Sequence, residues 1–455
     1  MGPVARRRAA LGAVVLGGCG AGGGPGGGRG AAGLPGGAPL PAGQDIVAAD
    51  IVLDLDAETG TARMEVAVAP RGGSAVLAID GLTLLHARVA GGDAAWDEGG
   101  RLVLQAAPDE DRVEADLAWR FPRRGLATAD GWMADAGGGA TLTWPHHCAN
   151  LFPCDPSPAE GASFSLRATA AEGQVLAPGD LGADAPSYQP AVARGDYARI
   201  DLGTSPGGVA MEAWHLPGRS AAARAGTAPL PAAMAHLEAL LGPYPYGGRF
   251  GAVEVDWGPW SWGGMEHHPL VHVAAFDFGN PEVQVHELVH AWFGGHVRIA
   301  CWEDLVLSEG TTTYLTARAL AAADGTDLWP MYVDDFLGPL CSGDPPPPVT
   351  LPDATCGAVD LTQHPLGGGA PYFKGACFFE ELGDAWGPDA VDAGLASFVG
   401  AHGGGAARMQ DLLDHLAAVA VDAGARDALD TAATDWLRTP GCPAEARRRC
   451  RSGRR

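Results

Sequence analysis

Apolar and polar residues alternate along the first part of the chain. In "DIVLDLDAETGTARMEVAVAP", Ile51, Leu53 and Leu55 occupy every second position, and the alternation resumes after "ETG". Strict alternation predicts half-buried strands, and the interruption predicts the turn of a hairpin. Short runs of this kind recur between turns rich in Gly, Asp and Pro. We therefore expect a β-rich N-terminal domain, a saddle or sandwich of one or two packed sheets, over residues 44–216.

The spacing of apolar residues changes near residue 217. In "APLPAAMAHLEALLG", Met234, Leu237 and Leu241 recur three or four positions apart, which predicts an amphipathic helix. The run "FGAVEVDW" that follows is typical of a strand. A second domain that mixes helices and strands is therefore expected over residues 217–440. Residues 441–455 contain "RRRCRSGRR", which should form a solvated basic tail.

Two further helices are expected in the second domain. Residues 280–282, Asn-Pro-Glu, combine a capping side chain, a proline for the first turn and an acid near the positive helix end. The helix that begins there should run through His290 and end near Gly294. The next helix should begin around Ser308 and continue through "TTTYLTARALAAADG".

The charge balance narrows the class of partner. The chain has 455 residues, enough for two or three domains, and 54 acidic against 30 basic side chains, a net charge of −24. Such an excess of negative charge argues against nucleic acid as a partner. All but one of the Lys and Arg residues are arginine, and the exception is Lys374.

The N-terminal stretch "MGPVARRRAALGAVVLGGCG" has the parts of an export signal. Arginines at positions 6–8 precede an apolar run that is too short to span a bilayer. "LGGC" resembles a bacterial lipobox, so residues 1–19 should be a signal peptide in which Cys19 is lipidated. Residues 20–43, rich in Gly and Pro, should form a flexible tether. We expect an exported lipoprotein anchored to a membrane of the cell envelope. The alternative is an ordinary signal peptide and a secreted or periplasmic soluble protein.

Eight cysteines remain when Cys19 is set aside. An even number in an exported protein permits up to four disulfides. His146 and His147 lie beside two of these cysteines and could belong to a second metal cluster, but an oxidising compartment favours a disulfide there. The pairs closest in sequence are the expected ones, and they leave Cys301 and Cys377 over: Cys148–Cys154, Cys341–Cys356 and Cys442–Cys450.

The stretch "VHELVHAWFGG" carries candidate metal chemistry. His286 and His290 are four residues apart on an expected helix, so both imidazoles can reach one ion. Glu287 is placed to act on a water rather than on the metal. Catalytic zinc takes three protein ligands and keeps one open position, so a third ligand should come from a neighbouring helix. Glu309 in "WEDLVLSEG", separated from His290 by 18 residues, is that candidate. Because Glu309 completes a set of three zinc ligands, a metal site is the stronger interpretation of His286 and His290, and a pair of ordinary core histidines is the weaker one.

These blocks resemble peptidase family M1, the gluzincin aminopeptidases that include aminopeptidase N and leukotriene hydrolase. The family pattern HExxHxWFG, followed by W.DLWLNEG, is similar to "HELVHAWFGGHVRIACWEDLVLSEG". "GGMEHH" resembles the family's GxMEN motif, and "PYFKGACFFEEL" resembles its YxKG motif. The resemblance covers about residues 45–420. It implies a multidomain fold in which the β-rich domain packs against a thermolysin-like α+β zinc metallopeptidase domain.

The resemblance also implies roles for individual residues. One Zn²⁺ ion would be bound by His286, His290 and Glu309, and Glu287 would act as the general base. Tyr372 would stabilise the oxyanion that forms as the peptide carbonyl is attacked. Glu266 would hold the free α-amine of the substrate. The other expected substrate-binding residues surround it in sequence: Gly263, Gly264, Met265 and His267.

The chain departs from the family pattern around the amine site. The Asn that follows the amine-binding Glu is His267 here, and a Gln or Glu of the β-rich domain is replaced by Trp144. The Asp of the family's DEP segment is displaced in "CDPSP". The amine anchor therefore rests on Glu266. Three tryptophans before the "GGMEHH" motif could line a substrate pocket or belong to the core: Trp257, Trp260 and Trp262.

The sequence thus predicts a zinc aminopeptidase that removes N-terminal residues from peptides with a free N-terminus. A zinc endopeptidase on the same scaffold and a non-catalytic zinc- or peptide-binding relative are the alternatives. We expect no large C-terminal helical domain of the kind that closes the cavity in many relatives. The cleft should then be more open, with less restriction on peptide length.

Overall fold

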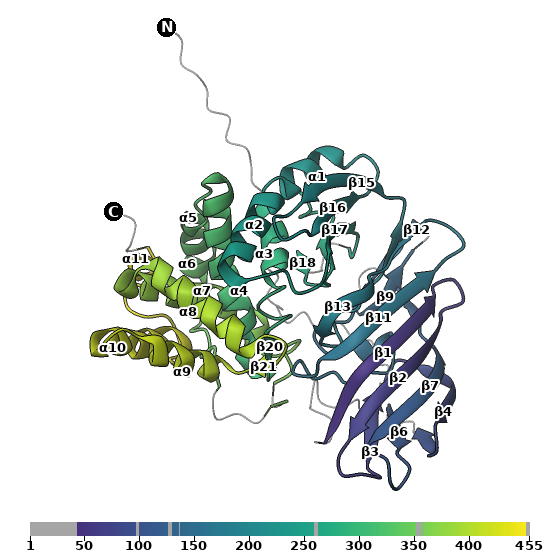
Figure 1. Ribbon diagram of the computed structural model, residues 1–455. Helices are drawn as coiled ribbons and strands as arrows, with labels where there is room; N and C mark the ends of the chain where they lie inside the picture. Colours follow the sequence, from purple (N-terminus) through teal and green to yellow (C-terminus); the bar gives the residue numbers. More distant parts are fainter. Residues whose placement is uncertain are drawn as a thin grey trace.

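Strands form one side of the molecule and helices gather on the other (Figure 1). The computed structural model describes residues 43–96, 100–125, 130–135, 137–258, 263–351, 356–357 and 359–451. The expected signal peptide, Cys19 and nearly all of the tether lie outside these residues. The expected fold class, a β-rich region followed by an α+β part, is confirmed.

The largest sheet has six strands in the order β13-β11-β1-β2-β7-β4. The expected hairpin forms, with Ile51 of β1 opposite Ala62 of β2. Ile51 and Leu53 are buried while Val52 and Asp54 are exposed, so alternation in sequence becomes one core face and one solvent face. The strands are β1 (Gln44–Asp54), β2 (Thr59–Val68), β4 (Thr83–Val89), β7 (Arg112–Arg120), β11 (Ala162–Thr169) and β13 (Gly179–Ala185).

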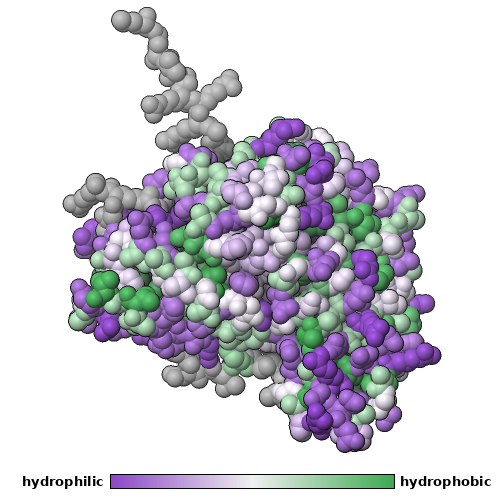
Figure 2. Space-filling view, in the orientation of Figure 1, coloured by the Kyte–Doolittle hydropathy of each residue, from purple (hydrophilic) through white to green (hydrophobic). Residues whose placement is uncertain are grey.

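Two smaller sheets complete the β-rich region. A three-stranded sheet has the order β3-β6-β5, and a five-stranded sheet has the order β12-β14-β10-β9-β8. On the face shown in Figure 2, the strand-rich end carries many hydrophilic side chains with scattered apolar ones. The strands are β3 (Ser74–Ala78), β5 (Ala94–Trp96), β6 (Arg101–Gln105), β8 (Arg123–Arg124), β9 (Gly131–Ala134), β10 (Gly139–Leu142), β12 (Gln174–Leu176) and β14 (Ala193–Gly195).

A mixed sheet forms the base of the second, helix-containing part, in the order β15-β16-β17-β19-β18. Its strands are β15 (Ala198–Thr204), β16 (Ala210–His215), β17 (Arg249–Val255), β18 (Gly264–Met265) and β19 (Leu270–Ala274). β16, β17 and β19 run parallel, and β19 is buried throughout, as expected for strands covered on both faces. Because β15 and β16 belong to this sheet, the structural change falls between β14 and β15 rather than at residue 216.

Helices cover the mixed sheet and extend away from it (Figure 1). The central helix α4 is buried continuously from Leu305 to Ala317, which is typical of a helix inside a large core. None of the described helices is long and apolar enough to cross a membrane. The α-helices are α1 (Ser220–Thr227), α2 (Leu230–Leu241), α3 (Pro281–Val289), α4 (Leu305–Asp324), α5 (Trp329–Met331), α6 (Gly338–Ser342), α7 (Ala370–Trp386), α8 (Pro388–His402), α9 (Met409–Val419), α10 (Ala423–Ala432) and α11 (Ala446–Arg449).

Shorter elements join these helices. π-Helical segments cover Tyr332–Leu337 and Ala433–Arg438. A 3-10 turn, Trp302–Asp304, leads directly into α4. Two short strands, β20 (Arg298–Ile299) and β21 (Ala406–Ala407), pair in parallel beside the helices.

Four disulfides use all eight cysteines outside the N-terminal stretch. Cys148–Cys154 forms as predicted. The other two expected pairs, Cys341–Cys356 and Cys442–Cys450, are wrong, because Cys356 bonds to Cys301 and Cys450 bonds to Cys377. The observed bonds join residues 55 to 101 positions apart, because the fold and not the sequence spacing brings the thiols together: Cys301–Cys356, Cys341–Cys442 and Cys377–Cys450.

The C-terminal segment was expected to be a solvated tail, but its residues 449 and 450 pack against the helices. Cys450 is fully buried, and Arg449 forms ion pairs with Glu381 at 2.5 Å and with Asp435 at 2.8 Å. Nearby, Lys374 of α7 is fully buried. Its ammonium donates to the carbonyls of Thr439 at 2.9 Å and Pro347 at 3.3 Å. Burial lowers the pKa of Lys374 to about 8.

Candidate metal centre and active site

Helix α3 presents the two histidines of the HELVH motif. Its predicted start is confirmed, because the Asn280 side chain accepts the backbone N–H of Glu282 at 3.2 Å. The helix ends at Val289, earlier than expected, with His290 at its C-cap. The Nε2 atoms of His286 and His290 lie 3.1 Å apart, so both imidazoles converge on one point.

Glu309 joins this point from α4. Its Oε2 lies 3.1 Å from Nε2 of His286 and 3.3 Å from Nε2 of His290. The expectation that α4 begins around Ser308 is wrong: the helix begins at Leu305, following the preceding 3-10 turn. Glu309 therefore projects from the second turn of a buried helix, where packing fixes its direction better than at a helix end.

The three donor atoms fit a zinc ion. Tetrahedral zinc with bonds of about 2.0–2.2 Å holds its ligand atoms about 3.3–3.5 Å apart. The separations here are 3.1 to 3.3 Å. Two imidazole nitrogens and one carboxylate are also the ligand types of a catalytic zinc site that keeps one position open. Among the described residues, this trio is one of two groups whose ligand atoms converge closely enough to hold a metal.

The backbone and α4 orient His290. Its Nδ1 lies 2.9 Å from the carbonyl of Phe293, so that nitrogen donates and Nε2 is left with its lone pair toward the cluster. The hydroxyls of Ser308 and Thr312 also lie 3.3 Å from Nδ1. These outer contacts are not visible in the motif, although Ser308 immediately precedes Glu309 in sequence.

The surrounding acids favour a cation at the cluster. Burial alone lowers the pKa of His290, but Glu309, Glu266 and Glu287 outweigh burial and raise it to about 10. Burial raises the pKa of Glu309, but His290 and His286 outweigh it and lower the pKa to about 2. The negative surroundings therefore stabilise positive charge at this point, whether a proton or a metal ion carries it.

Glu287 faces the cluster from the same helix. It belongs to the second converging group, in which ligand atoms of Glu266, Glu287 and His290 lie within 4.8 Å of one another. Gly264 of β18 packs directly against it, since a Cβ at that position would lie 2.3 Å from Glu287 Oε1. Burial raises the pKa of Glu287 well above its usual value, which makes its carboxylate a stronger base.

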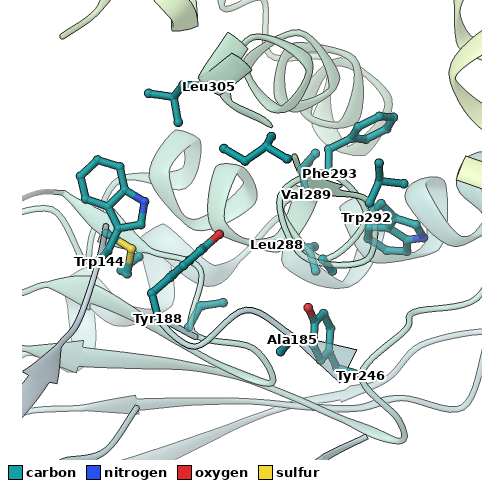
Figure 3. Close-up of a cluster of buried hydrophobic side chains, with 14 of the residues drawn as sticks. Trp144, Ala185, Tyr188, Tyr246, Leu288, Val289, Trp292, Phe293 and Leu305 are labelled. Carbon is teal, nitrogen blue, oxygen red and sulfur yellow. The ribbon is translucent and has the colours of Figure 1, made fainter. Parts of the chain in front are cut away.

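Glu266 has a partner that the sequence did not suggest. The hydroxyl of Tyr188, from the β-rich side of the molecule, hydrogen-bonds to the Glu266 carboxylate. Figure 3 shows the Tyr188 hydroxyl pointing from that side toward the helix that carries Leu288 and Val289. No motif or spacing marks Tyr188, because its position depends on the packing of two distant regions.

Tyr372 reaches the cluster through a close contact between helices. A Cβ at Gly375 of α7 would lie 2.6 Å from the Cα of Gly310 of α4, so only glycines permit this approach. The contact places the Tyr372 ring in a stack on His286, with 5.9 Å between centroids. Burial and the neighbouring Glu309 raise the pKa of Tyr372 well above its usual value, so its hydroxyl stays protonated and able to donate.

His267 is a correction to the expected substrate-binding set. Its ring packs against His272 and Trp257, with centroids 4.8 and 6.4 Å away, and it is not among the residues that line the cavity. Glu266 lines the cavity, whereas the His267 ring faces the core. Trp257 is likewise buried in the core. Trp260 and Trp262 lie outside the described residues.

The cluster lies in a cavity of about 110 Å³ that opens to solvent. The expected residues Gly263, Gly264 and Met265 line it. Trp144, which stands where the family has a Gln or Glu, also lines it, and its ring contacts Trp302 edge-on at 5.9 Å. Further lining residues come from both sides of the metal cluster: Asp277, Asn280, Glu282, Val283, Thr313, Met331, Phe336 and Phe373.

Two family models match the chain. The peptidase family M1 domain matches residues 279–436, which contain the three donors of the cluster. A model described as an OAA-family lectin sugar binding domain matches residues 85–143. That second segment is divided among three sheets of the β-rich region, so it is not a structural unit by itself.

Curated relatives share part of the chain. Leucine aminopeptidase 2 of Aspergillus niger is 31% identical over 209 residues, which cover 39% of this chain and 32% of that protein. Aminopeptidase N of Streptomyces lividans is 32% identical over 161 residues, which cover 34% of this chain and 18% of that protein. The matched region thus spans a third or less of these relatives' length.

Solved structures share the whole arrangement. An M1 zinc metallopeptidase from Deinococcus radiodurans superposes with a TM-score of 0.74 and 22% identity, covering 88% of this chain and 95% of that one. Yeast LTA4 hydrolase superposes with a TM-score of 0.73 and 19% identity, covering 88% of this chain and 68% of that one. At such identities the likeness concerns the fold. The likeness to peptidase family M1 rests on the family model over residues 279–436 and on the partial matches to the curated relatives.

Proposed function

We propose that this protein is a zinc-dependent aminopeptidase. The observation that carries the proposal is the arrangement of Glu266 beside Glu287 and His290, with ligand atoms within 4.8 Å. A carboxylate at that distance can hold the α-amine of a peptide while the first peptide bond lies at the metal cluster. The distance from amine to scissile carbonyl is then fixed, so one residue is removed at a time.

Zinc held by His286, His290 and Glu309 would supply Lewis-acid chemistry, polarising the peptide carbonyl and acidifying a water. Glu287 accepts the proton of that water and later donates it to the departing amine. Tyr372 donates its hydroxyl toward the oxygen that gains negative charge. Tyr188 keeps the Glu266 carboxylate oriented toward the substrate amine.

The test compares peptides with a free N-terminus against the same peptides N-acetylated, with Glu287→Gln as the inactive reference. Stepwise release of first residues from the free peptides alone supports the proposal. Equal internal cleavage of both sets would instead support a zinc endopeptidase in which Trp144 has weakened the amine site. Zinc binding without turnover in either set would support the non-catalytic relative.

We also propose export and lipid anchoring at Cys19. The arginines at 6–8, the short apolar run and "LGGC" support this, as do four disulfides, which form in oxidising compartments. Fractionation of expressing cells tests it. The wild-type protein should require detergent for release, and Cys19→Ala should not. Release of both without detergent would contradict the lipid anchor.

A further inference from the structure

The cavity contains two carboxylates that the catalytic steps above do not use. Asp277 and Glu282 line the same cavity as the metal cluster. Asp277 is in the loop that precedes α3, and Glu282 is in the first turn of that helix. The sequence marked Glu282 only as an acid at the start of a helix, and it did not mark Asp277.

The two carboxylates lie across the metal cluster from the amine site. Glu266 converges with Glu287 and His290, toward the C-terminal end of α3. Glu282 is one helical turn before His286, on the same face of α3, and it interacts electrostatically with His286 and Asp277. A peptide with its amine at Glu266 and its first carbonyl at the cluster therefore extends its second residue toward Glu282 and Asp277.

Asp277 lacks compensation for its burial. Its side chain is only 6% exposed. Its Oδ1 accepts one long hydrogen bond, 3.5 Å from Nδ2 of Asn280, and its Oδ2 has no hydrogen-bond partner among the described residues. A buried carboxylate oxygen without a partner is costly. A cationic group that entered the cavity would supply the missing partner.

Glu282 is held in place but not neutralised by a basic side chain. The hydroxyl of Tyr332 donates to its Oε1 at 3.0 Å. Within the part of the chain that the structure describes, neither Asp277 nor Glu282 forms an ion pair with Arg or Lys. This contrasts with buried Glu212, which pairs with Arg199 and Arg249.

The walls near these acids are apolar. Phe336 and Phe373 are stacked, with 4.6 Å between centroids, and both line the cavity with Met331 and Val283. A long side chain with a methylene stem and a charged tip matches such walls, because the stem packs on apolar surface while the tip meets the carboxylates.

We propose that Asp277 and Glu282 select an arginine or lysine at the second position of the peptide, immediately after the bond that is cut. The inference rests on the proposed aminopeptidase function and names its substrate class. The pair acts on binding and positioning of the leaving residue, and it takes no part in proton transfer.

The experiment measures release of leucine by the full-length protein loaded with zinc. Leu-Arg-Ala is compared with Leu-citrulline-Ala, in which the guanidinium is replaced by a neutral group of the same shape. We expect kcat/KM for the arginine peptide to exceed that for the citrulline peptide by at least about tenfold, as for a charge-assisted contact. Glu282→Gln and Asp277→Asn, measured separately in case one fails to fold, should each bring the ratio closer to one.

Asp335→Asn is the matched control, because Asp335 is an exposed carboxylate on the same π-helical segment as Tyr332, and its ratio should equal that of the wild type. Equal rates for the two peptides would overturn the inference while leaving the aminopeptidase function standing. No leucine release from either peptide would overturn the aminopeptidase function itself. A preference that appears for Arg-Leu-Ala over citrulline-Leu-Ala, and not at the second position, would place the acids on the other side of the cut bond and contradict the inference.

Discussion

The carboxylates of the six-stranded sheet and those of the cavity are held in opposite ways. On the sheet, Arg63 pairs with Glu114 at 3.0 Å and Arg167 with Asp50 at 2.7 Å, all with exposed side chains. In the cavity, the carboxylates are buried close together, and the nearest basic groups are the histidines of the cluster. Exposed pairs contribute little to stability, whereas buried like charges oppose folding. The cavity thus retains an electrostatic cost that favours binding of a cation.

The largest expected effect is that of removing the metal. A strong chelator should abolish turnover and lower the free energy of unfolding by about 3–4 kcal/mol, because the clustered acids lose their compensating charge. Thermal unfolding and peptide release, measured before and after chelation, check this prediction. Added zinc should restore both. Unchanged activity after the metal content has fallen to background would show that the cluster is not the reactive site.

Glu160 sharpens the comparison, because it is a partly buried carboxyl in the β-rich region that does not line the cavity. Burial raises its pKa to about 7, although it accepts the Ile46 N–H. The folded state therefore holds this proton more tightly than the unfolded state, so its stabilising contribution is present below pH 4.5 and is lost as pH rises toward 7.

Glu160→Gln should remove that part of the pH dependence. The free energy of unfolding of the variant, relative to wild type, should rise by about 2 kcal/mol between pH 4.5 and 7.5. Denaturant titrations at several pH values measure the difference. A constant difference over that range would mean that Glu160 titrates normally in the folded protein.

A smaller effect is expected where the two regions meet. Tyr188→Phe removes the donor to Glu266 and should raise KM about tenfold for peptides with a free amine, with less change in kcat. Tyr197→Phe offers a control, because Tyr197 is a partly buried tyrosine that interacts electrostatically with Glu254 and not with Glu266. An equal change in KM for both variants would indicate a general structural effect instead.

The smallest effect belongs to the exposed sheet. Arg167→Ala removes the ion pair with Asp50 and should change the free energy of unfolding by less than about 0.5 kcal/mol, because solvent and salt screen the pair. Urea unfolding at low and high salt measures it. A loss above about 2 kcal/mol would break the comparison, since an exposed pair would then stabilise as much as a buried one.

Local patterns predicted what depends on local contacts. The alternation around Ile51 gave the β1–β2 hairpin, and the residues at 280–282 gave the start of α3. The metal donors were found because a helix fixes the spacing of His286 and His290 and the family motif supplies Glu309.

Features that depend on distant contacts were missed. The parallel pairing of β1 with β11 joins residues more than 100 positions apart, and three disulfides follow the packing of helices rather than sequence spacing. Tyr188 and Asp277 carry no motif, and only the folded chain brings Tyr188 to Glu266 and Asp277 to the cavity. His267 was misplaced because a motif match does not state which way a side chain points.

The burial of Lys374 has a practical consequence. It is the single lysine of the sequence, and it is inaccessible to solvent in the fold. Reagents that acylate ε-amines should leave the folded protein unlabelled at lysine, and coupling to amine-reactive beads or dyes should proceed through the N-terminal amine alone where that amine is free. Label that appears on Lys374 would then show that the helices around α7 have opened. This readout needs no substrate.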